Sequence, residues 1–158
     1  MRHTESGFTA IELIVVILII GLVAFMAIPL MANVLDALDV SKAKGAAEQV
    51  ASAIEQTRAY AILQSCTYRV AFPGNNQFQI SPDPGTCATS ATGEGPTPLA
   101  NNGQVTPQGG TDGGCGGGWC IWFNSTGTSI AKSIIVNAGP DQRTVTVTVA
   151  GRVQVTVP

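Results

Sequence analysis

Few residues in this chain of 158 have side chains that could carry out chemistry. Only 11% are charged, and the single histidine, His3, lies near the start. Because His3 lies ahead of the long apolar run, a Ser-His-Asp triad, a Cys-His dyad and a His-based zinc site are nearly excluded. Asp36 and Asp39 are spaced like a carboxylate pair, but on a polar helical face we expect both to be solvated. We therefore expect no enzyme, no catalytic residue, no metal and no cofactor.

Glu12 is the charged residue with the most unusual position. It directly precedes Leu13–Ala32, an uncharged apolar run of about 20 residues, which is the length that spans the hydrocarbon core of a bilayer. Arg2 lies before the run, so the positive-inside rule places the short N-terminal end in the cytoplasm and the rest outside. A carboxylate at such a position usually has a partner. No cation nearby in the chain offers one, and we expect it to come from another copy or from a newly made amino terminus.

Four cysteines follow the apolar run and lie on its predicted outer side: Cys66, Cys87, Cys115 and Cys120. An even number of cysteines in an oxidising compartment favours two disulfides, for which three pairings exist. We favour Cys66–Cys87 with Cys115–Cys120, because each closes a local segment. A metal site is less favoured, because histidine and C-x-x-C spacing are both missing.

The segment Gly7–Val16, GFTAIELIVV, resembles the processing site of type IV prepilins and type II secretion pseudopilins. The resemblance implies that a prepilin peptidase cuts between Gly7 and Phe8 and that Phe8 is then N-methylated. Glu12 becomes the family's glutamate at the fifth mature position, and Pro29 takes the proline at the twenty-second. Ala10 departs from the family, which more often has Leu there.

This processing would give Glu12 a partner. Cleavage would place a positive amine on Phe8, and Glu12 of one subunit could neutralise the amine of a staggered neighbour inside a helical bundle. We expect such a buried pair to set the register of the subunits more than to stabilise them. We also expect residues 8–32 to contact membrane lipid before assembly.

The pattern of apolar residues predicts one long helix. Leu35, Leu38, Val50, Ile54 and Ala61 fall on one face, which extends the helix beyond the membrane run. A helix from Thr9 to Gln64 would be about 80 Å long, and Pro29 should kink or locally open it. We expect its C-terminal half to pack on the chain's own sheet.

After Ser65 the periodicity changes to that of strands. Strands are expected at Thr67–Phe72, Gln77–Ser81, Trp119–Asn124 and Ser133–Asn137, and valines alternate on both sides of Ala150–Gly151 in a final hairpin. We expect the valine face of that hairpin to cover the helix. Residues 82–118 are rich in Gly, Pro, Ser and Thr and are expected to form a long loop without regular structure.

These segments predict an α+β, pilin-like fold, in which a long helix packs by its second half on a small antiparallel sheet. The expected divisions are a leader at 1–7, a transmembrane half-helix at 8–32, an amphipathic half-helix at 33–65 and a periplasmic β domain at 66–158. Two C-terminal segments, Gly118–Asn124 and Gly151–Val155, resemble the G-W-x-x-F and G-R-V-x-V segments of the GspH/FimT family of minor pseudopilins and minor pilins.

Arg143 and Arg152 are candidate DNA contacts. They are expected to face each other across the final hairpin, and in some relatives a G-R-x-R motif at this end contacts DNA. Here Gln154 occupies the last position of the motif, and the chain after Gly7 has seven basic and nine acidic residues. Phosphate binding needs several cations, so we expect DNA binding to be weak.

The resemblance implies a minor pseudopilin that assembles into a periplasmic type II secretion pseudopilus. Its implied partners are other pilin or pseudopilin subunits, the prepilin peptidase and an assembly platform in the inner membrane. The protein would be a single-pass inner-membrane protein with a periplasmic C-terminal domain. The alternatives are a minor pilin of a type IV pilus, which could assist DNA uptake, and a membrane-anchored ligand-binding module.

Overall fold

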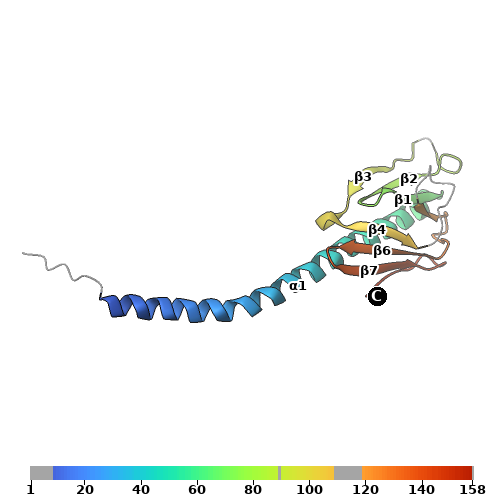
Figure 1. The fold of residues 1–158 in the computed structure, drawn as a ribbon. Helices are drawn as coiled ribbons and strands as arrows, with labels where there is room; N and C mark the ends of the chain where they lie inside the picture. Colours follow the sequence, from blue (N-terminus) through green and yellow to red (C-terminus); the bar gives the residue numbers. More distant parts are fainter. Residues whose placement is uncertain (1–8, 89, 109–118, 158) are drawn as a thin grey trace, which may run out of the picture. The chain divides into compact units, whose positions relative to one another are not determined.

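A computed structural model of the chain describes residues 9–88, 90–108 and 119–157, except for the side chains of residues 27–33, 35 and 36 (Figure 1). The chain divides into two compact units on either side of the Leu38–Asp39 bond. We refer to them as the N-terminal unit and the globular unit. The fold is α+β, as predicted.

The N-terminal unit is helical. Helix α1 (Ala10–Leu63) begins in this unit and extends into the globular unit, in agreement with the predicted helix from Thr9 to Gln64. It continues through Pro29 rather than ending there. Between Ile11 and Met26 every large apolar side chain is 44% to 78% exposed. Within the part of the chain that the structure describes, no helix combines the length and the mean hydropathy of a membrane span.

In the globular unit, the second half of α1 buries one stripe of small and medium side chains. Every member is at most 3% exposed, and the stripe consists of Ala43, Ala46, Ala47, Val50, Ala53, Ile54 and Ala61. Alanine favours helix and lets strands approach the helix closely. Lys42, Lys44, Glu48 and Glu55 are exposed on the other side, as expected for an amphipathic helix.

The first of two antiparallel sheets has the strand order β3-β2-β1-β5. Its strands are β1 (Tyr68–Gly74), β2 (Gln77–Pro82), β3 (Glu94–Pro98) and β5 (Trp119–Phe123). The register pairs Val70 with Ile80 and with Ile121, and all three are buried. The expected strands β1, β2 and β5 are therefore confirmed.

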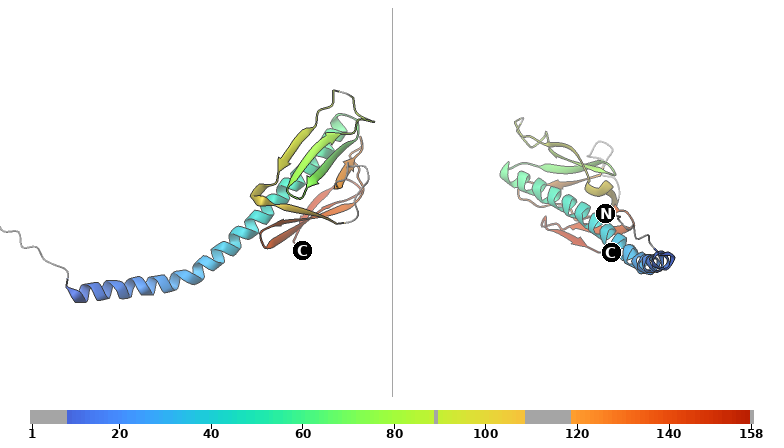
Figure 2. Two further views of the ribbon diagram at one scale, coloured as in Figure 1. Left: turned by 45° about the horizontal axis from the view of Figure 1, so that its top comes forward. Right: turned by 90° about the vertical axis from the view of Figure 1, so that its left-hand side faces the viewer.

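The second sheet has the order β4-β6-β7-β8. Its strands are β4 (Gln104–Gln108), β6 (Lys132–Ala138), β7 (Asp141–Val147) and β8 (Val153–Thr156). Figure 2 shows the second half of α1 alongside both sheets. Residues of α1 and of both sheets form one hydrophobic core, in which Tyr68 and Phe123 are the largest fully buried side chains.

The expectation that residues 82–118 lack regular structure is wrong. Strands β3 and β4 and a short 3₁₀ helix, η1 (Ala100–Asn102), lie within this range. Both strands are outer strands, where proline is tolerated because one edge makes no ladder hydrogen bonds. Pro96 and Pro107 therefore fit these strands, while buried Leu99 and Val105 attach the segment to the core.

The expectation for the final hairpin is only partly correct. Val145 and Val147 of β7 are fully buried, but Val149, Val155 and Val157 are exposed. Strand β8 is an outer strand, and only its first residue, Val153, packs against the core. The valine face therefore covers the helix from β7 and not along the whole hairpin.

Candidate functional site

Glu12 caps the beginning of α1. Its Oε2 accepts a hydrogen bond from the backbone N–H of Thr9 (3.0 Å) and another from the Thr9 hydroxyl (2.9 Å). Thr9 precedes the helix, and its carbonyl accepts the N–H groups of Glu12 and Leu13. A threonine before the helix with a glutamate three residues later is the capping-box spacing, in which the carboxylate satisfies an N–H that has no partner within the helix.

The cap adds a partner of Glu12 that the sequence analysis did not expect. A nearby group in the chain does contact the carboxylate, and the T-x-x-E spacing of Thr9 and Glu12 was the signal that could have identified it. The donors are neutral, however. In residues 9–88, 90–108 and 119–157, no cationic side chain lies within 4.0 Å of a Glu12 oxygen. Within the described residues, neutral donors alone hold the carboxylate in place.

The side chains around Glu12 are apolar and exposed. Ile11, Val15 and Val16 line a shallow open groove together with Glu12. A carboxylate in such a surface can bind a cation, because the neutral donors of Thr9 do not compensate its charge. The predicted processing residues Gly7 and Phe8 lie outside the described residues. Pro29 lies in the described helix backbone, and its side chain is outside the description.

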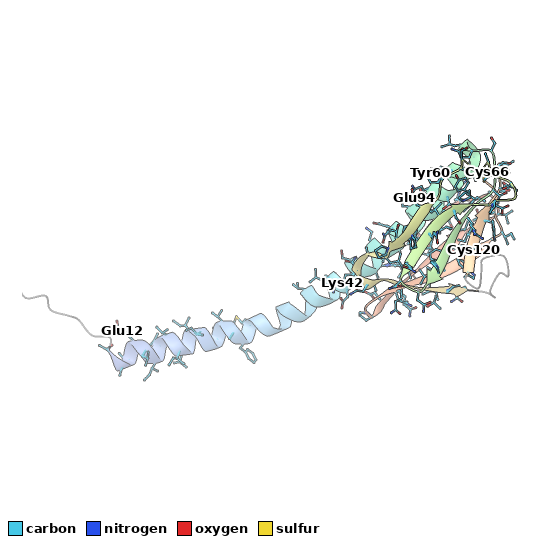
Figure 3. All side chains as sticks on the ribbon, turned by 90° about the horizontal axis from the view of Figure 1, so that it is seen from above. Glu12, Lys42, Tyr60, Cys66, Glu94 and Cys120 are labelled. Atoms are coloured by element: carbon cyan, nitrogen blue, oxygen red, sulfur yellow. A yellow bond between two sulfur atoms is a disulfide. The ribbon has the colours of Figure 1, made fainter. Side chains whose placement is uncertain are left out.

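The Cys66–Cys87 disulfide is present, as predicted, with the two Cα atoms 5.0 Å apart. It joins the segment after α1 to the turn after β2, where Thr67 N–H also donates to the Thr86 hydroxyl (3.0 Å). Cys120 is disulfide-bonded as well, and its predicted partner, Cys115, lies outside the described residues. Figure 3 labels Cys66 and Cys120.

A network around Glu94 fastens β3 to α1. Glu94 Oε1 accepts hydrogen bonds from Gln56 Nε2 (2.5 Å) and from the Tyr60 hydroxyl (2.9 Å). Figure 3 shows Tyr60 and Glu94 side by side. The Tyr60 ring also lies 5.6 Å from that of Tyr68, centroid to centroid. The sequence analysis missed this network, because the donors lie 34 and 38 residues away from Glu94 in the chain.

Lys132 connects the two sheets. Its Nζ donates to the carbonyl of Cys120 (2.7 Å) and lies 5.0 Å from the centroid of the Trp119 ring. Lys132 begins β6 in one sheet, whereas both partners belong to β5 in the other. Burial lowers the pKa of the Lys132 ammonium, because the charged form loses part of its hydration. We interpret Lys132 as a structural contact.

Arg143 and Arg152 are not opposite each other, which corrects the expected register. Arg143 pairs with Val136 on β6, whereas Arg152 lies at the turn, where its N–H donates to the Thr148 hydroxyl (3.1 Å). Val145 and Val147 lie between them on β7, paired with β8. Nε of Arg143 is buried, while Arg152 is exposed. In the observed register the residue opposite Arg152 is Thr148, five residues after Arg143, so the two arginines do not form one contact surface.

Gly151 brings this turn close to α1. A Cβ on Gly151 would lie 2.2 Å from the carbonyl oxygen of Gly127 and 2.8 Å from Nε of Arg58. Arg58 Nε itself donates to that carbonyl (3.1 Å). Gly151 also has a φ of +72°, a backbone conformation that favours glycine. The Gly-Arg pair that resembles the family motif is therefore explained locally by packing at Gly151.

Comparison with known proteins identifies the family. Residues 46–151 match the family model described as type II transport protein GspH. The chain belongs to the GspH family. This confirms the predicted resemblance to the GspH family, and the matched region contains the segment Gly118–Asn124. The matched region begins within α1 and does not contain Glu12 or the predicted cleavage site.

Solved structures share the fold of this GspH-family chain. Two crystal structures of the type IV minor pilin FimU from Pseudomonas aeruginosa align with TM-scores of 0.52 and 0.55 at 14% and 15% identity, covering 73% and 75% of this chain and 96% and 93% of FimU. The minor pseudopilin EpsH of the Vibrio cholerae type 2 secretion system aligns at 0.54 and 17% identity, covering 74% of this chain and 98% of EpsH. A search of curated proteins finds no match.

The GspH family and the pilin-like fold make this chain a structural subunit of the minor pilin or pseudopilin kind, and not an enzyme. The family implies assembly with other pilin or pseudopilin subunits. The groups relevant to such a role are therefore surfaces that meet other subunits. Among the described residues, the exposed apolar side chains from Ile11 to Met26, with Glu12 at their beginning, are a candidate for such a surface.

Proposed function

We propose that this GspH-family chain is a minor pseudopilin that is stored in the inner membrane and assembles into a periplasmic type II secretion pseudopilus. The observation that carries the proposal is the exposure of every large apolar side chain from Ile11 to Met26. So large an apolar surface is stable in water only when lipid or protein covers it. In the proposal, lipid covers Leu13–Ala32 before assembly and helices of neighbouring subunits cover it afterwards.

The proposal gives the leader and Glu12 defined roles. A prepilin peptidase cleaves between Gly7 and Phe8, and the new amine on Phe8 is methylated. Glu12 then binds the amine of a neighbouring subunit while an inner-membrane platform adds the chain to the filament. The cap formed by Thr9 supports this role, because it holds the carboxylate at the start of α1. Pro29 lets α1 adapt where the helix passes into the packed bundle.

Intact mass of the protein purified from its own membrane tests the processing step. We expect a chain that begins at Phe8, carries one extra methyl group and lacks four hydrogens because of two disulfides. Gly7→Ser should leave the leader attached, so that the measured mass is that of the uncleaved variant chain from Met1 to Pro158. A wild-type chain that still begins at Met1 would instead favour a membrane-anchored binding module.

Deletion of the gene distinguishes the two filament systems. For a pseudopilin, we expect an exoprotein to accumulate in the periplasm while surface pili remain normal. Loss of surface pili or of DNA uptake, with secretion intact, would overturn the type II assignment in favour of a type IV minor pilin. Complementation with the wild-type chain and with Gly7→Ser provides the matched control, since only the former is expected to restore function.

A further inference from the structure

Strand β8 is the last strand of the second sheet, and within the described residues it pairs only with β7. The N–H of Thr148 donates to the carbonyl of Arg152 (2.9 Å), so these two residues form a hydrogen-bonded position of the ladder. Bonded and non-bonded positions alternate along an antiparallel pair. The backbone N–H and C=O groups of Val153 and Val155 therefore point away from β7, toward the outer edge of the sheet. We call this edge of β8 the open edge.

The other outer strands of the described sheets are protected against pairing with another chain. Strands β3 and β4 contain Pro96 and Pro107, and proline has no N–H to donate. Strand β5 is mostly buried, and the Lys132 ammonium donates to its Cys120 carbonyl. Strand β8 has the sequence VQVT, without proline or charge. Sheets normally block an exposed edge by such features, so the open edge indicates a binding site for an extended segment.

A groove of about 330 Å³ lies between α1 and the beginning of β8. Helix α1 lines it with Arg58, Ala59 and Ile62, and β8 lines it with Val153. Val153 pairs with Val147, which belongs to the core that α1 shares with the sheets, so the two side chains lie on the helix-facing side of the sheet. A strand paired with the open edge would lie about 4.8 Å from β8 and would place every second side chain on this side.

The groove is apolar with a positive rim. Its lining combines alanine, isoleucine and valine side chains with Arg58, Arg152 and one acidic residue, Glu55. Among the described residues, neither guanidinium group has a carboxylate oxygen within 4.0 Å. The bond from Arg58 Nε to the Gly127 carbonyl uses one of the five N–H donors of that side chain. An extended segment that carries aliphatic side chains and a carboxylate is therefore complementary to the groove.

We propose that the open edge and its groove bind an extended segment of a different pilin or pseudopilin subunit. The backbone of the segment pairs with Val153 and Val155, as in other complexes in which a peptide extends a sheet. An aliphatic side chain of the segment covers Ala59 and Ile62, and a carboxylate lies beside Arg152. The inference rests on the filament function proposed above and adds how the chain contacts an unlike subunit. A minor subunit is present in few copies, so most of its neighbours in a filament are other chains.

Photo-crosslinking of the full chain in its native host tests the contact. Val157, which follows β8 and is 68% exposed, is replaced by p-benzoylphenylalanine, and filaments are irradiated. We expect an adduct with a different pilin or pseudopilin subunit, through a peptide that contains aliphatic and acidic residues. The matched control carries the same probe at Gln104, which is exposed on β4 at the opposite edge of the sheet.

Several results of this experiment would overturn the proposal. They are the absence of an adduct, equal yields from positions 157 and 104, and an adduct formed only with lipid, with a protein of another kind or with a second copy of this chain.

Val155→Pro tests the backbone pairing. It removes the N–H that points to the open edge, while Gln154 and Thr156 keep their bonds to β7. In the chain with the probe at position 157, it should lower the adduct yield about tenfold, because one main-chain hydrogen bond is lost. Val155→Thr keeps the N–H and the shape of the side chain and should retain most of the yield. Equal yields in two variants that unfold at the wild-type temperature would overturn the pairing.

Arg152→Glu tests the charge of the partner. Arg152 is exposed, so the substitution should leave the fold intact. The variant should lower the adduct yield about tenfold, whereas Arg152→Lys should retain most of it. An unchanged yield with Arg152→Glu would overturn the acidic character of the bound segment.

Intact mass and filament incorporation of the same samples separate this inference from the proposed function. A chain that is cleaved, methylated and incorporated but gives no adduct refutes the contact at the open edge and leaves the filament function standing. A chain that keeps its leader and is absent from filaments refutes both. A mature, incorporated chain with an adduct that Val155→Pro reduces supports both.

Discussion

The two parts of α1 differ in the exposure of their apolar side chains. From Ile11 to Met26 apolar residues occupy every side of the helix and are exposed, whereas from Ala43 to Ala61 they occupy one stripe and are buried by the chain's own sheets. Glu94 in the globular unit and Glu12 in the N-terminal unit also differ in their hydrogen-bond partners. Glu94 accepts hydrogen bonds from two side chains of the globular unit, whereas the donor to Glu12 among the described residues is Thr9, in the helix cap. The first part of the helix therefore needs other molecules to cover it, and the second does not.

The largest expected difference between the units is in the response to truncation of an apolar side chain. Phe123→Ala removes a fully buried ring and should lower the unfolding free energy of the globular unit by about 3–5 kcal/mol. Leu18→Ala, in the N-terminal unit, should change it by less than about 0.5 kcal/mol. Denaturant unfolding of the detergent-solubilised protein measures both. Equal losses would show that the two units unfold as one.

The Cys66–Cys87 disulfide should contribute to the globular unit alone. It closes a loop with a sequence separation of 21, for which the chain-entropy model gives about 3 kcal/mol. The Cys66→Ser/Cys87→Ser double variant should therefore unfold at a markedly lower denaturant concentration. Circular dichroism in detergent should show that the first half of α1 stays helical. Loss of that helicity would contradict the separation of the units.

Glycine substitution should have opposite signs in the two units. Gly151→Ala places a Cβ against the Gly127 carbonyl at positive φ and should destabilise the globular unit by about 1–3 kcal/mol. Gly21→Ala meets no atom within 4 Å on the helix and should favour helix by at most about 1 kcal/mol. Thermal unfolding followed by circular dichroism distinguishes the two, and a neutral Gly151→Ala would refute the close approach at the turn.

The smallest expected effect is at the Glu94 network. Tyr60→Phe removes one donor to Glu94 and should lower the unfolding free energy of the globular unit by about 1 kcal/mol. Thr9→Ala removes the hydroxyl donor to Glu12 and keeps the backbone donor, so it should weaken the cap of α1 and leave the globular unit unaffected. Hydrogen exchange near Glu94 and near Glu12 reports the two sites separately. Faster exchange near Glu94 in Thr9→Ala would contradict the account.

How far the sequence predicted the structure depended on the range of the interactions. The helix, β1, β2 and the strands of the final hairpin were predictable because their periodicity is local. Strands β3 and β4 were missed, since both contain proline and each is held in place by pairing with a neighbouring strand along one edge. The turn at Ala150–Gly151 was expected correctly, but the facing of Arg143 and Arg152 was not, because Arg152 lies in the turn segment and not on a strand.

Some residues of the candidate site were predictable from the sequence and others were not. The residue type and position of Glu12 singled it out, and the cysteine count and spacing suggested Cys66–Cys87. The role of Thr9 could have been read from its spacing to Glu12, whereas the Gln56–Tyr60–Glu94 network could not, because its members meet only in the folded chain.

Incorporation of Glu12→Ala into filaments tests the central claim most directly. The variant and its control, Glu94→Ala, would each be expressed in the native host, and sheared filaments would be compared with membranes by immunoblot. The account predicts that Glu12→Ala reaches the membrane, is cleaved and is absent from filaments, while Glu94→Ala is incorporated like the wild type. Normal incorporation of Glu12→Ala would contradict the claim that this carboxylate joins neighbouring subunits.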